Sequence, residues 1–410
     1  MSALENNLRL LRDTCRDVRE KLGAHEQAAA LGPVVSLLDD MLVQQGVLPA
    51  LAQARDAALN TSGAAGADLS YWQGYQSAVA AQSVALESGA PAERIDTAAL
   101  QTYLATLPGE AGVRVVAARV VSRGFSKKTV LVSLQGNRTL PAEIALRIDQ
   151  PFNYLGTTVS DEFPWLRQLA AHGARIAQPF ALEGSGRVLG QKFLVSAKVN
   201  GGAVGGNYVS PPRNPALVAD IAHALAGIHR VRLEGLRGLQ PAGPHIMREV
   251  DAYYRDWQAL GAVSPALEAG FAWVRRNLAA AHGPEAIIHN DYNFNNMMIE
   301  GDRLLAVVDW EFAHIGTPAA DLGYFYYSAE NTASFDYFLD QYRQAGGTVP
   351  AQATLDFYIF WGQLRLAVMG FQAVAGLNGG NFKDIRFAAS LGHLRSGMMR
   401  VCGKLMELPG

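Results

Sequence analysis

The sequence is poor in cysteine, with only Cys15 and Cys402 among its 410 residues. So few cysteines supply no disulfide framework, and we therefore expect a protein of the reducing cytoplasm. An excess of charge is also lacking, because 35 Lys and Arg stand against 37 Asp and Glu, a formal net charge of -2. This balance removes the electrostatic argument for a nucleic-acid or anionic-membrane partner, and we expect neither.

Long uncharged apolar runs are missing as well. The most apolar stretch, 357–377, contains Arg365 and three glycines, and it is typical of a buried helix rather than a membrane span. The first six residues show no basic start leading into an apolar run, so we expect no secretory signal. With 49% hydrophobic and 18% charged residues, the composition indicates a compact folded protein of two or three domains.

The first 90 residues carry apolar side chains at alternating spacings of four and three, beginning with Leu4, Leu8 and Leu11. This spacing places them on one face of a helix. Breaks at 62–66 and 88–91 separate the segments. We therefore expect a helical N-terminal extension over residues 1–90. Packing within the chain explains its apolar stripes most simply, and a homodimer through these helices stays open as an alternative.

Residues 91–199 change in character. Asp96 is a good N-cap for a short helix ending after Leu107, and a second helix is expected at 160–171. Five apolar runs are predicted to be strands, at 113–121, 129–134, 143–148, 177–182 and 192–199. Their β-branched content and polar breaks favour a five-stranded antiparallel sheet. We expect residues 91–199 to form a small lobe around it.

Residues 200–410 are expected to form a large helical lobe. Pro215 suits a first helical position, and the apolar side chains behind it recur on one helix face. One short β-like interruption, at 297–309, lies in this part. The fold class is therefore α+β.

The interruption carries the residues of most chemical interest. The run from His289 to Asn296 contains Asp291, and an apolar strand then ends in Asp309. Phosphoryl transfer to an alcohol needs a carboxylate for the attacking hydroxyl, oxygen ligands for Mg²⁺ and cations for the phosphates. Asp291, Asn296 and Asp309 supply the carboxylates and the amide, although a lone Asp in a loop is more often explained by turn geometry.

The pattern His-x-Asp-x-x-x-x-Asn, followed by a strand ending in Asp, resembles the aminoglycoside phosphotransferase and choline kinase group. The continuation from Asp309 to Leu322 is similar to one branch of it, the phosphotransferases related to the kinase domain of acyl-CoA dehydrogenase fusion proteins. The resemblance covers about residues 95–400. It implies a bilobal protein-kinase-like fold and a kinase that uses ATP and Mg²⁺.

Site roles follow from this resemblance by position. Asp291 would be the catalytic base, and Asn296 and Asp309 would hold the metal. His289 would brace the catalytic loop, and Asp321 would tether it by hydrogen bonds.

The resemblance also implies a nucleotide site in the small lobe. Arg147 stands at the place of the phosphate-contacting lysine, and Glu162 fits its ion-pair partner. The alternatives are a surface Arg and a Glu favoured by a helix dipole. Residues Gly124, Phe125, Ser126 and Lys127 would meet the phosphates, or would form a hairpin turn without a ligand. Residues Ser196 to Val199 would be the hinge that binds adenine.

The resemblance implies that the phosphate acceptor is a small molecule with a hydroxyl group. An aminoglycoside needs a cluster of carboxylates for its ammonium groups, but the acidic residues after Asp321 are scattered and matched by Arg and Lys. The resemblance favours a hydroxyacid or hydroxyacyl-CoA. An aminoglycoside or other antibiotic stays open as an alternative, and so does a nucleotide-binding pseudokinase or assembly module.

Overall fold

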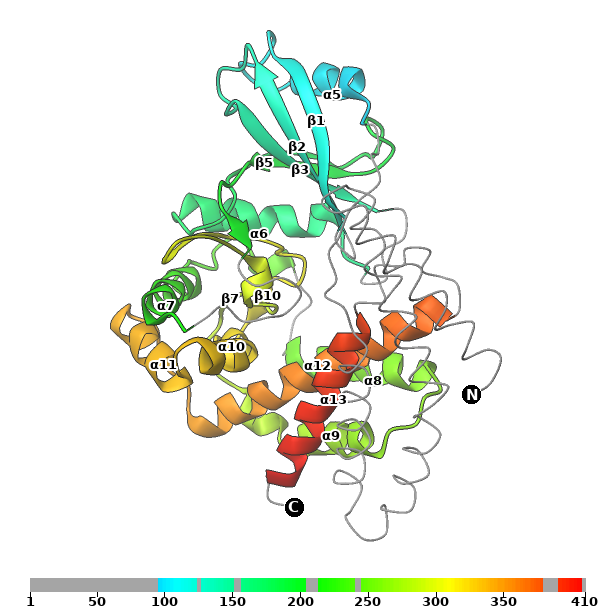
Figure 1. Cartoon of the computed structure of the whole chain (residues 1–410), viewed down its shortest axis with the longest axis vertical. Coiled ribbons are helices and arrows are strands. Elements are labelled where there is room, and N and C mark those ends of the chain that lie inside the picture. The colour runs from blue at the N-terminus through cyan, green and yellow to red at the C-terminus, as the bar shows by residue number, and fades with distance from the viewer. Residues whose placement is uncertain are drawn as a thin grey trace, which may run out of the picture. The chain divides into compact units, whose positions relative to one another are not determined.

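A computed structural model describes residues 95–123, 127–150, 156–203, 213–239, 245–378 and 390–407 (Figure 1). The described residues divide into two compact units. One lies within Ala92–Gly243 and His282–Leu355, and the other within Pro244–Ala281 and Asp356–Gly410. The expected helical extension at 1–90 lies outside the described residues, as do Gly124, Phe125 and Ser126. The division into 1–90, 91–199 and 200–410 stays a prediction.

The first unit contains the five-stranded antiparallel sheet that the sequence predicts. Its strands are β1 (Arg114–Arg123), β2 (Lys127–Gln135), β3 (Glu143–Asp149), β4 (Pro179–Glu183) and β5 (Phe193–Ala197). They pair in the order β1-β2-β3-β5-β4. With the helices around it, this sheet confirms the expected α+β fold class, and we call it and its two helices the small lobe.

Helix α5 (Thr97–Leu104) begins at the expected N-cap, where the Asp96 carboxylate accepts hydrogen bonds from the N–H groups of Ala98 and Ala99. The helix ends at Leu104, earlier than the expected Leu107. Only turn residues continue to Leu107, whose N–H donates to the Leu104 carbonyl oxygen over three residues, a tighter closure than an α-helix makes.

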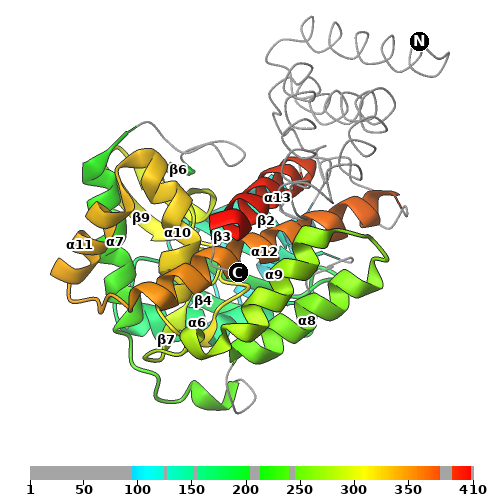
Figure 2. The same ribbon diagram turned by 90° about the horizontal axis from the view of Figure 1, so that it is seen from below.

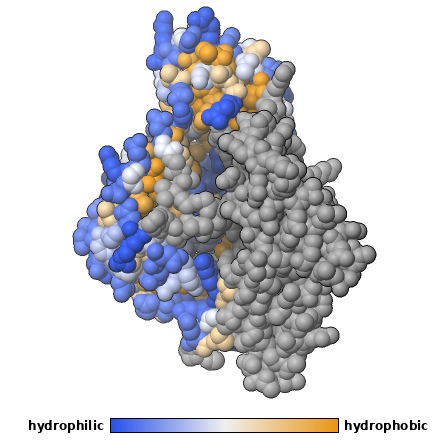
Figure 3. Space-filling view, viewed as in Figure 1, coloured by the Kyte–Doolittle hydropathy of each residue, from blue (hydrophilic) through white to orange (hydrophobic). Residues whose placement is uncertain are grey.

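Alternation along the strands decides which side chains reach the site. Leu146 of β3 is fully buried in the apolar core that lies against α5. Its neighbour Arg147 therefore points to the other face of the sheet. Helix α6 (Val159–Ala171), which begins at a Thr158 capping box, packs on that face (Figure 1). An arginine of β3 and the first turn of α6 are thus brought together. The outer surface of the small lobe is hydrophilic at its tip, beside apolar groups (Figure 3).

Glu110 ties the segment after α5 to the turn between β2 and β3. Its buried carboxylate accepts hydrogen bonds from the backbone N–H groups of Arg138, Thr139 and Leu140 and from the Thr139 hydroxyl. Burial alone would raise the pKa of Glu110, but these hydrogen bonds lower it to about 2. No cation is needed for this shift.

The helical part of the first unit surrounds two small sheets. Its elements are β6 (Gly202–Ala203), α7 (Pro215–His229), η2 (Arg237–Leu239), β7 (Ala286–Ile288), η4 (Phe294–Asn296), β8 (Met297–Glu300), β9 (Arg303–Val307), β10 (His314–Gly316), α10 (Ala319–Thr332) and α11 (Phe335–Gln344). The expected apolar face of α7 is confirmed, because Val218, Ile221 and Leu225 are fully buried. The β-like interruption at 297–309 is the antiparallel pair β8–β9.

The second unit is helical. Its elements are α8 (His245–Ala259), α9 (Pro265–Arg276), η3 (Leu278–Ala281), most of α12 (Gln352–Asn378) and α13 (Ser390–Glu407) (Figure 2). The apolar stretch around Arg365 forms a buried helix, as expected, and Arg365 Nη1 donates to Glu249 Oε1 at 2.7 Å. Among the helices that the structure describes, none has the length and apolar content to cross a membrane.

Candidate active site

The loop after β7 is shaped by a buried carboxylate. Asp321, in the first turn of α10, accepts hydrogen bonds from the N–H groups of His289 (2.8 Å) and Asn290 (2.7 Å). Asn290 has a φ of 62°, a left-handed conformation that asparagine tolerates better than most residues. Two adjacent backbone donors therefore turn toward one carboxylate, and the chain bends sharply just before Asp291.

A histidine supports Asp321 from α7. His229 Nε2 donates to Asp321 Oδ2 at 3.1 Å, while the Tyr342 hydroxyl lies 2.8 Å from His229 Nδ1. Burial would raise the pKa of Asp321, but the hydrogen bond and charge of His229, with the backbone donor of His289, lower it below its ordinary value. The sequence analysis did not identify His229 as a site residue. Its partner lies 92 residues away, so no local pattern could have revealed it.

His289 connects the loop that bears Asp291 to the chain just before Asp309. Its Nδ1 accepts from the Asp291 N–H at 3.2 Å, and its Nε2 donates to the Val308 carbonyl oxygen at 2.9 Å. These two bonds assign the tautomer, because one ring nitrogen accepts and the other donates. The ring also meets Trp310 edge-on at 4.7 Å. His289 therefore has the partners that the expected bracing role requires.

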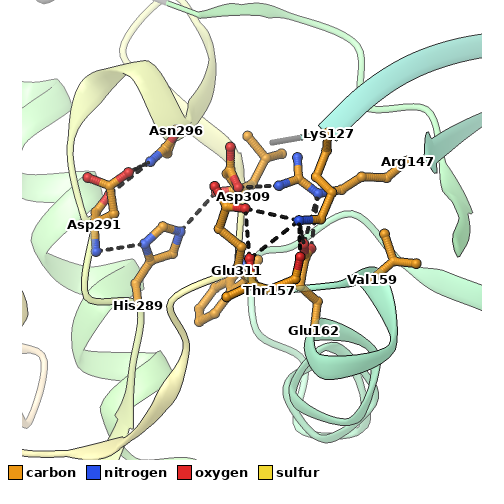
Figure 4. A network of polar contacts seen from close by, with 12 residues as sticks. Lys127, Arg147, Thr157, Val159, Glu162, His289, Asp291, Asn296, Asp309 and Glu311 are labelled. Atoms are coloured by element: carbon orange, nitrogen blue, oxygen red, sulfur yellow. Dashed lines mark hydrogen bonds and ion pairs between the residues drawn. The ribbon is translucent and has the colours of Figure 1, made fainter. Parts of the chain in front are cut away.

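Two side-chain amides hold the Asp291 carboxylate. Asn296 Nδ2 donates to Asp291 Oδ2 at 2.7 Å (Figure 4). Asn293 Nδ2 donates to Asp291 Oδ1 at 2.9 Å. Asn293 was missed in the sequence, since an Asn in a loop is usually a turn former, and it is indeed the N-cap of η4. The structure thus gives the expected base a fixed orientation.

Asn296 and Asp309 are brought close by strand pairing. Met297 faces Val307 in the β8–β9 ladder, and the Val308 N–H donates to the Asn296 carbonyl oxygen at 2.8 Å. Asp309 follows with a φ of 68°, the second non-glycine residue in a left-handed conformation among those described. The Asn296 amide oxygen and the Asp309 carboxylate are hard oxygen donors of the kind that Mg²⁺ takes from proteins. The residues present therefore fit such an ion.

Arg147 lies between two carboxylates. Its Nε donates to Glu162 Oε2 at 3.0 Å, and its Nη2 forms an ion pair with Asp309 Oδ1 (Figure 4). The charges of Asp309 and Glu162 raise the pKa of Arg147 even though burial opposes this. Burial raises the pKa of Glu162 to about 7, and the charge of Arg147 opposes that shift. The expected pairing of Arg147 with Glu162 is present in the structure.

Lys127, expected to meet phosphates, has other partners here. It is the first residue of β2, and only 1% of its side chain is exposed. Its Nζ donates to the Thr157 carbonyl oxygen at 2.8 Å and to Glu311 Oε2 at 3.1 Å. Among the expected hinge residues, Ser196 lies in β5 opposite Ala145, and Val199 follows that strand. Contact of either residue with a nucleotide stays a prediction.

The arrangement suits one kind of chemistry. A carboxylate held by two amides lies on the same loop as an amide oxygen, and a second carboxylate lies beside an arginine. A base and hard oxygen ligands, with a cation nearby, are the parts that phosphoryl transfer uses.

Comparison with known proteins agrees with this geometry. The model of the phosphotransferase enzyme family matches residues 117–358, more than half of the chain. The chain is 27% identical to acyl-CoA dehydrogenase family member 11 of Pongo abelii over 177 residues, which is 41% of this chain and 22% of that protein. It thus spans about a fifth of the length of that relative.

Solved structures share the fold. A putative aminoglycoside phosphotransferase from Ralstonia eutropha JMP134 aligns with a TM-score of 0.60 and 19% identity, over 77% of this chain and all of that one. A spectinomycin phosphotransferase, solved with ADP and spectinomycin, aligns with a TM-score of 0.53 and 11% identity, over 77% of this chain and all of that one. The resemblance drawn from the residues is therefore confirmed, and the chain belongs to the phosphotransferase enzyme family.

Proposed function

We propose that this protein is a kinase that moves the γ-phosphoryl group of ATP, with Mg²⁺, to the hydroxyl of a small molecule. The observation that carries the proposal is the Asp291 carboxylate, which accepts from the side-chain amides of Asn293 and Asn296, while the pairing of β8 with β9 brings Asn296 close to Asp309. Nucleotide use is supported by two neighbours in fold, a spectinomycin phosphotransferase solved with ADP and an aminoglycoside 2'-phosphotransferase solved with GDP.

Asp291 would orient the acceptor hydroxyl and take its proton. The amides of Asn293 and Asn296 donate to the two oxygens of this carboxylate and hold it in one orientation. A carboxylate in a fixed position can contribute a factor of about 10²–10⁴ to the rate. The two asparagines therefore serve the base by limiting its rotation.

Asn296 and Asp309 would hold the metal, which supplies positive charge beside the transferred phosphoryl group. Arg147 would contact phosphate oxygens, because a guanidinium can donate to two of them at once. Glu162 fixes the Nε side of the guanidinium, at 3.0 Å, and so directs its remaining N–H groups.

For the acceptor we propose a hydroxyacid or hydroxyacyl-CoA. Similarity to acyl-CoA dehydrogenase family member 11 supports this choice over a polycation. So does the charge of the chain beyond Asp321, where acidic and basic residues are matched rather than gathered into an anionic patch.

The test is ADP release from purified protein with Mg-ATP across hydroxyacids, their CoA esters, choline and an aminoglycoside. We expect release that depends on a hydroxyacid or its CoA ester. The variant D291N should lower turnover about 10²–10⁴-fold while still binding ATP, since it removes the base and keeps the shape of the side chain. Release that depends only on the aminoglycoside would overturn the acceptor, and unchanged turnover of D291N would overturn the assigned base. ATP binding without release on any acceptor would favour a pseudokinase.

A further inference from the structure

Lys127 is the most deeply buried cation beside the candidate active site. Only 1% of its side chain is exposed, whereas 18% of the Arg147 side chain is. In the β2–β3 register Lys127 lies opposite Asp149, on the face of the sheet that carries Arg147. An ammonium group is costly to bury unless oxygens surround it.

Oxygens from three separate segments surround this ammonium group. Its Nζ lies 2.8 Å from the Thr157 carbonyl oxygen and 3.1 Å from Glu311 Oε2. The carboxylates of Asp149 and Glu162 follow at 3.8 and 3.9 Å. Thr157 also donates its hydroxyl to Glu311 Oε2 at 3.2 Å. Lys127 thus joins the end of β3, the start of α6 and the segment just after Asp309 (Figure 4).

Two of these partners adjoin the groups assigned to metal and nucleotide. Glu311 lies two residues after Asp309, and Glu162 is the carboxylate that accepts from Arg147 Nε. Without Lys127, three carboxylates near one another, those of Asp149, Glu162 and Glu311, would lose a cation that they share. Their repulsion would move Glu162 and Glu311, and with them Arg147 and Asp309.

We propose that Lys127 is a positioning residue for phosphoryl transfer. It acts through Glu311 and Glu162, which fix Asp309 and Arg147, rather than by touching a phosphate. This role rests on the proposed function and replaces the phosphate contact expected from the sequence. It also explains why a lysine, with three donors on one atom, suits the position.

The test is the affinity for Mg-ATP, measured by calorimetry on the full chain. We expect K127M to bind Mg-ATP about 10–100-fold more weakly, the usual loss when a group that orients ligands is removed. K127R, which keeps the charge, should recover part of the affinity. The matched control is K128M, the next residue on β2, half-buried and on the opposite face, which should bind within about twofold of wild type.

A double-mutant cycle separates positioning from direct contact. If Lys127 acts through Glu311, the loss in K127M/E311Q should be smaller than the product of the losses in K127M and E311Q. Losses that multiply would overturn the proposal in favour of an independent phosphate contact. If K127M does not fold, the affinity of K127M/E311Q is measured instead. This double variant removes one positive and one negative charge and so keeps the net charge of the buried cluster. We then expect at least tenfold weaker binding, and wild-type affinity would overturn the proposal.

The outcomes also separate this inference from the proposed function. Wild-type protein that binds no Mg-ATP would overturn both. Wild-type binding matched by a folded K127M would overturn only the role of Lys127. Thermal unfolding of each variant shows which of them are folded.

Discussion

Asp321 and Glu162 are buried to the same extent, and their pKa values move in opposite directions. Asp321 is 0% exposed and Glu162 is 1% exposed, yet the pKa of Asp321 is lowered and that of Glu162 is raised to about 7. Asp321 receives two backbone donors and a histidine. Glu162 shares its cations with the other carboxylates Asp149, Asp309 and Glu311. Burial alone therefore does not decide in which direction the pKa of a carboxyl group moves. The direction depends on how many hydrogen-bond donors and cations the group has without sharing them with other carboxylates.

The two buried carboxyl groups have different structural roles. Asp321 has its hydrogen-bond donors in place and fixes the backbone of the loop just before Asp291. The surroundings of Glu162 hold more carboxylates than cations, which suits a place where a metal ion is expected to add positive charge. Substitutions at buried carboxyl groups of each kind should therefore have different effects on stability.

The largest effect is expected from D321N. The amide keeps the shape of the side chain but removes the charge that His289 N–H, Asn290 N–H and His229 share, so polar groups stay buried without a full partner. The free energy of unfolding should fall by about 3–5 kcal/mol, as for other broken buried pairs, measured by urea titration. The control D340N, in an exposed ion pair with Arg343, should change it by about 0.5 kcal/mol or less. A loss in D321N no larger than in D340N would contradict this role of Asp321.

The raised pKa of Glu162 predicts that its contribution to stability depends on pH. The folded pKa of Glu162, about 7, lies above its ordinary value of 4.5, so the folded protein holds the extra proton between these values. Its contribution to stability is therefore present below pH 4.5 and is lost as the pH rises through 7. Unfolding of wild type and E162Q should be compared at pH 4.5 and pH 8. The stability of E162Q relative to wild type should rise by about 3 kcal/mol over this range, and a difference independent of pH would contradict the shift.

The smallest effect is expected from E110Q, which tests anchoring without a cation. The pKa of Glu110 is lowered to about 2, so its stabilisation is present above pH 4.5 and is lost as the pH falls through 2. At pH 7 the variant should lose about 1–3 kcal/mol of unfolding free energy, and the loss should shrink at pH 3. The control is E143Q, in the exposed pair with Lys198, which should lose about 0.5 kcal/mol or less. An equal loss in both variants would show that the backbone donors do not favour the charged form.

Local patterns predicted most of the small lobe. The expected strand at 143–148 is β3 (Glu143–Asp149), and the expected helix at 160–171 is α6 (Val159–Ala171). Alternation and capping are read from neighbouring residues, so they are visible in a single sequence. The short strands β7 and β10 were not predicted, because each has three residues and their paired residues are 26 to 30 positions apart in the sequence.

The motif identified the loop from His289 to Asn296 as the candidate site, but it did not identify the residues that support this loop. Lys127 meets Glu311 across 184 residues, and His229 meets Asp321 across 92. Nothing in the surroundings of Lys127 in the sequence distinguishes a buried lysine from one that faces phosphates. Only the fold, which brings β2, α6 and the end of β9 together, sets its partners.

The ion pair between Arg147 and Asp309 has a consequence for the coupling between metal binding and nucleotide binding. Under the proposed function, a metal ion arriving alone competes with a guanidinium for Asp309, whereas the phosphates of a nucleotide offer that guanidinium another partner. Each ligand then removes part of the penalty that the other meets. Thermodynamic reciprocity requires both affinities to rise by the same factor. The pair would thus make the protein respond to the metal–nucleotide complex as a whole, and discriminate against free Mg²⁺.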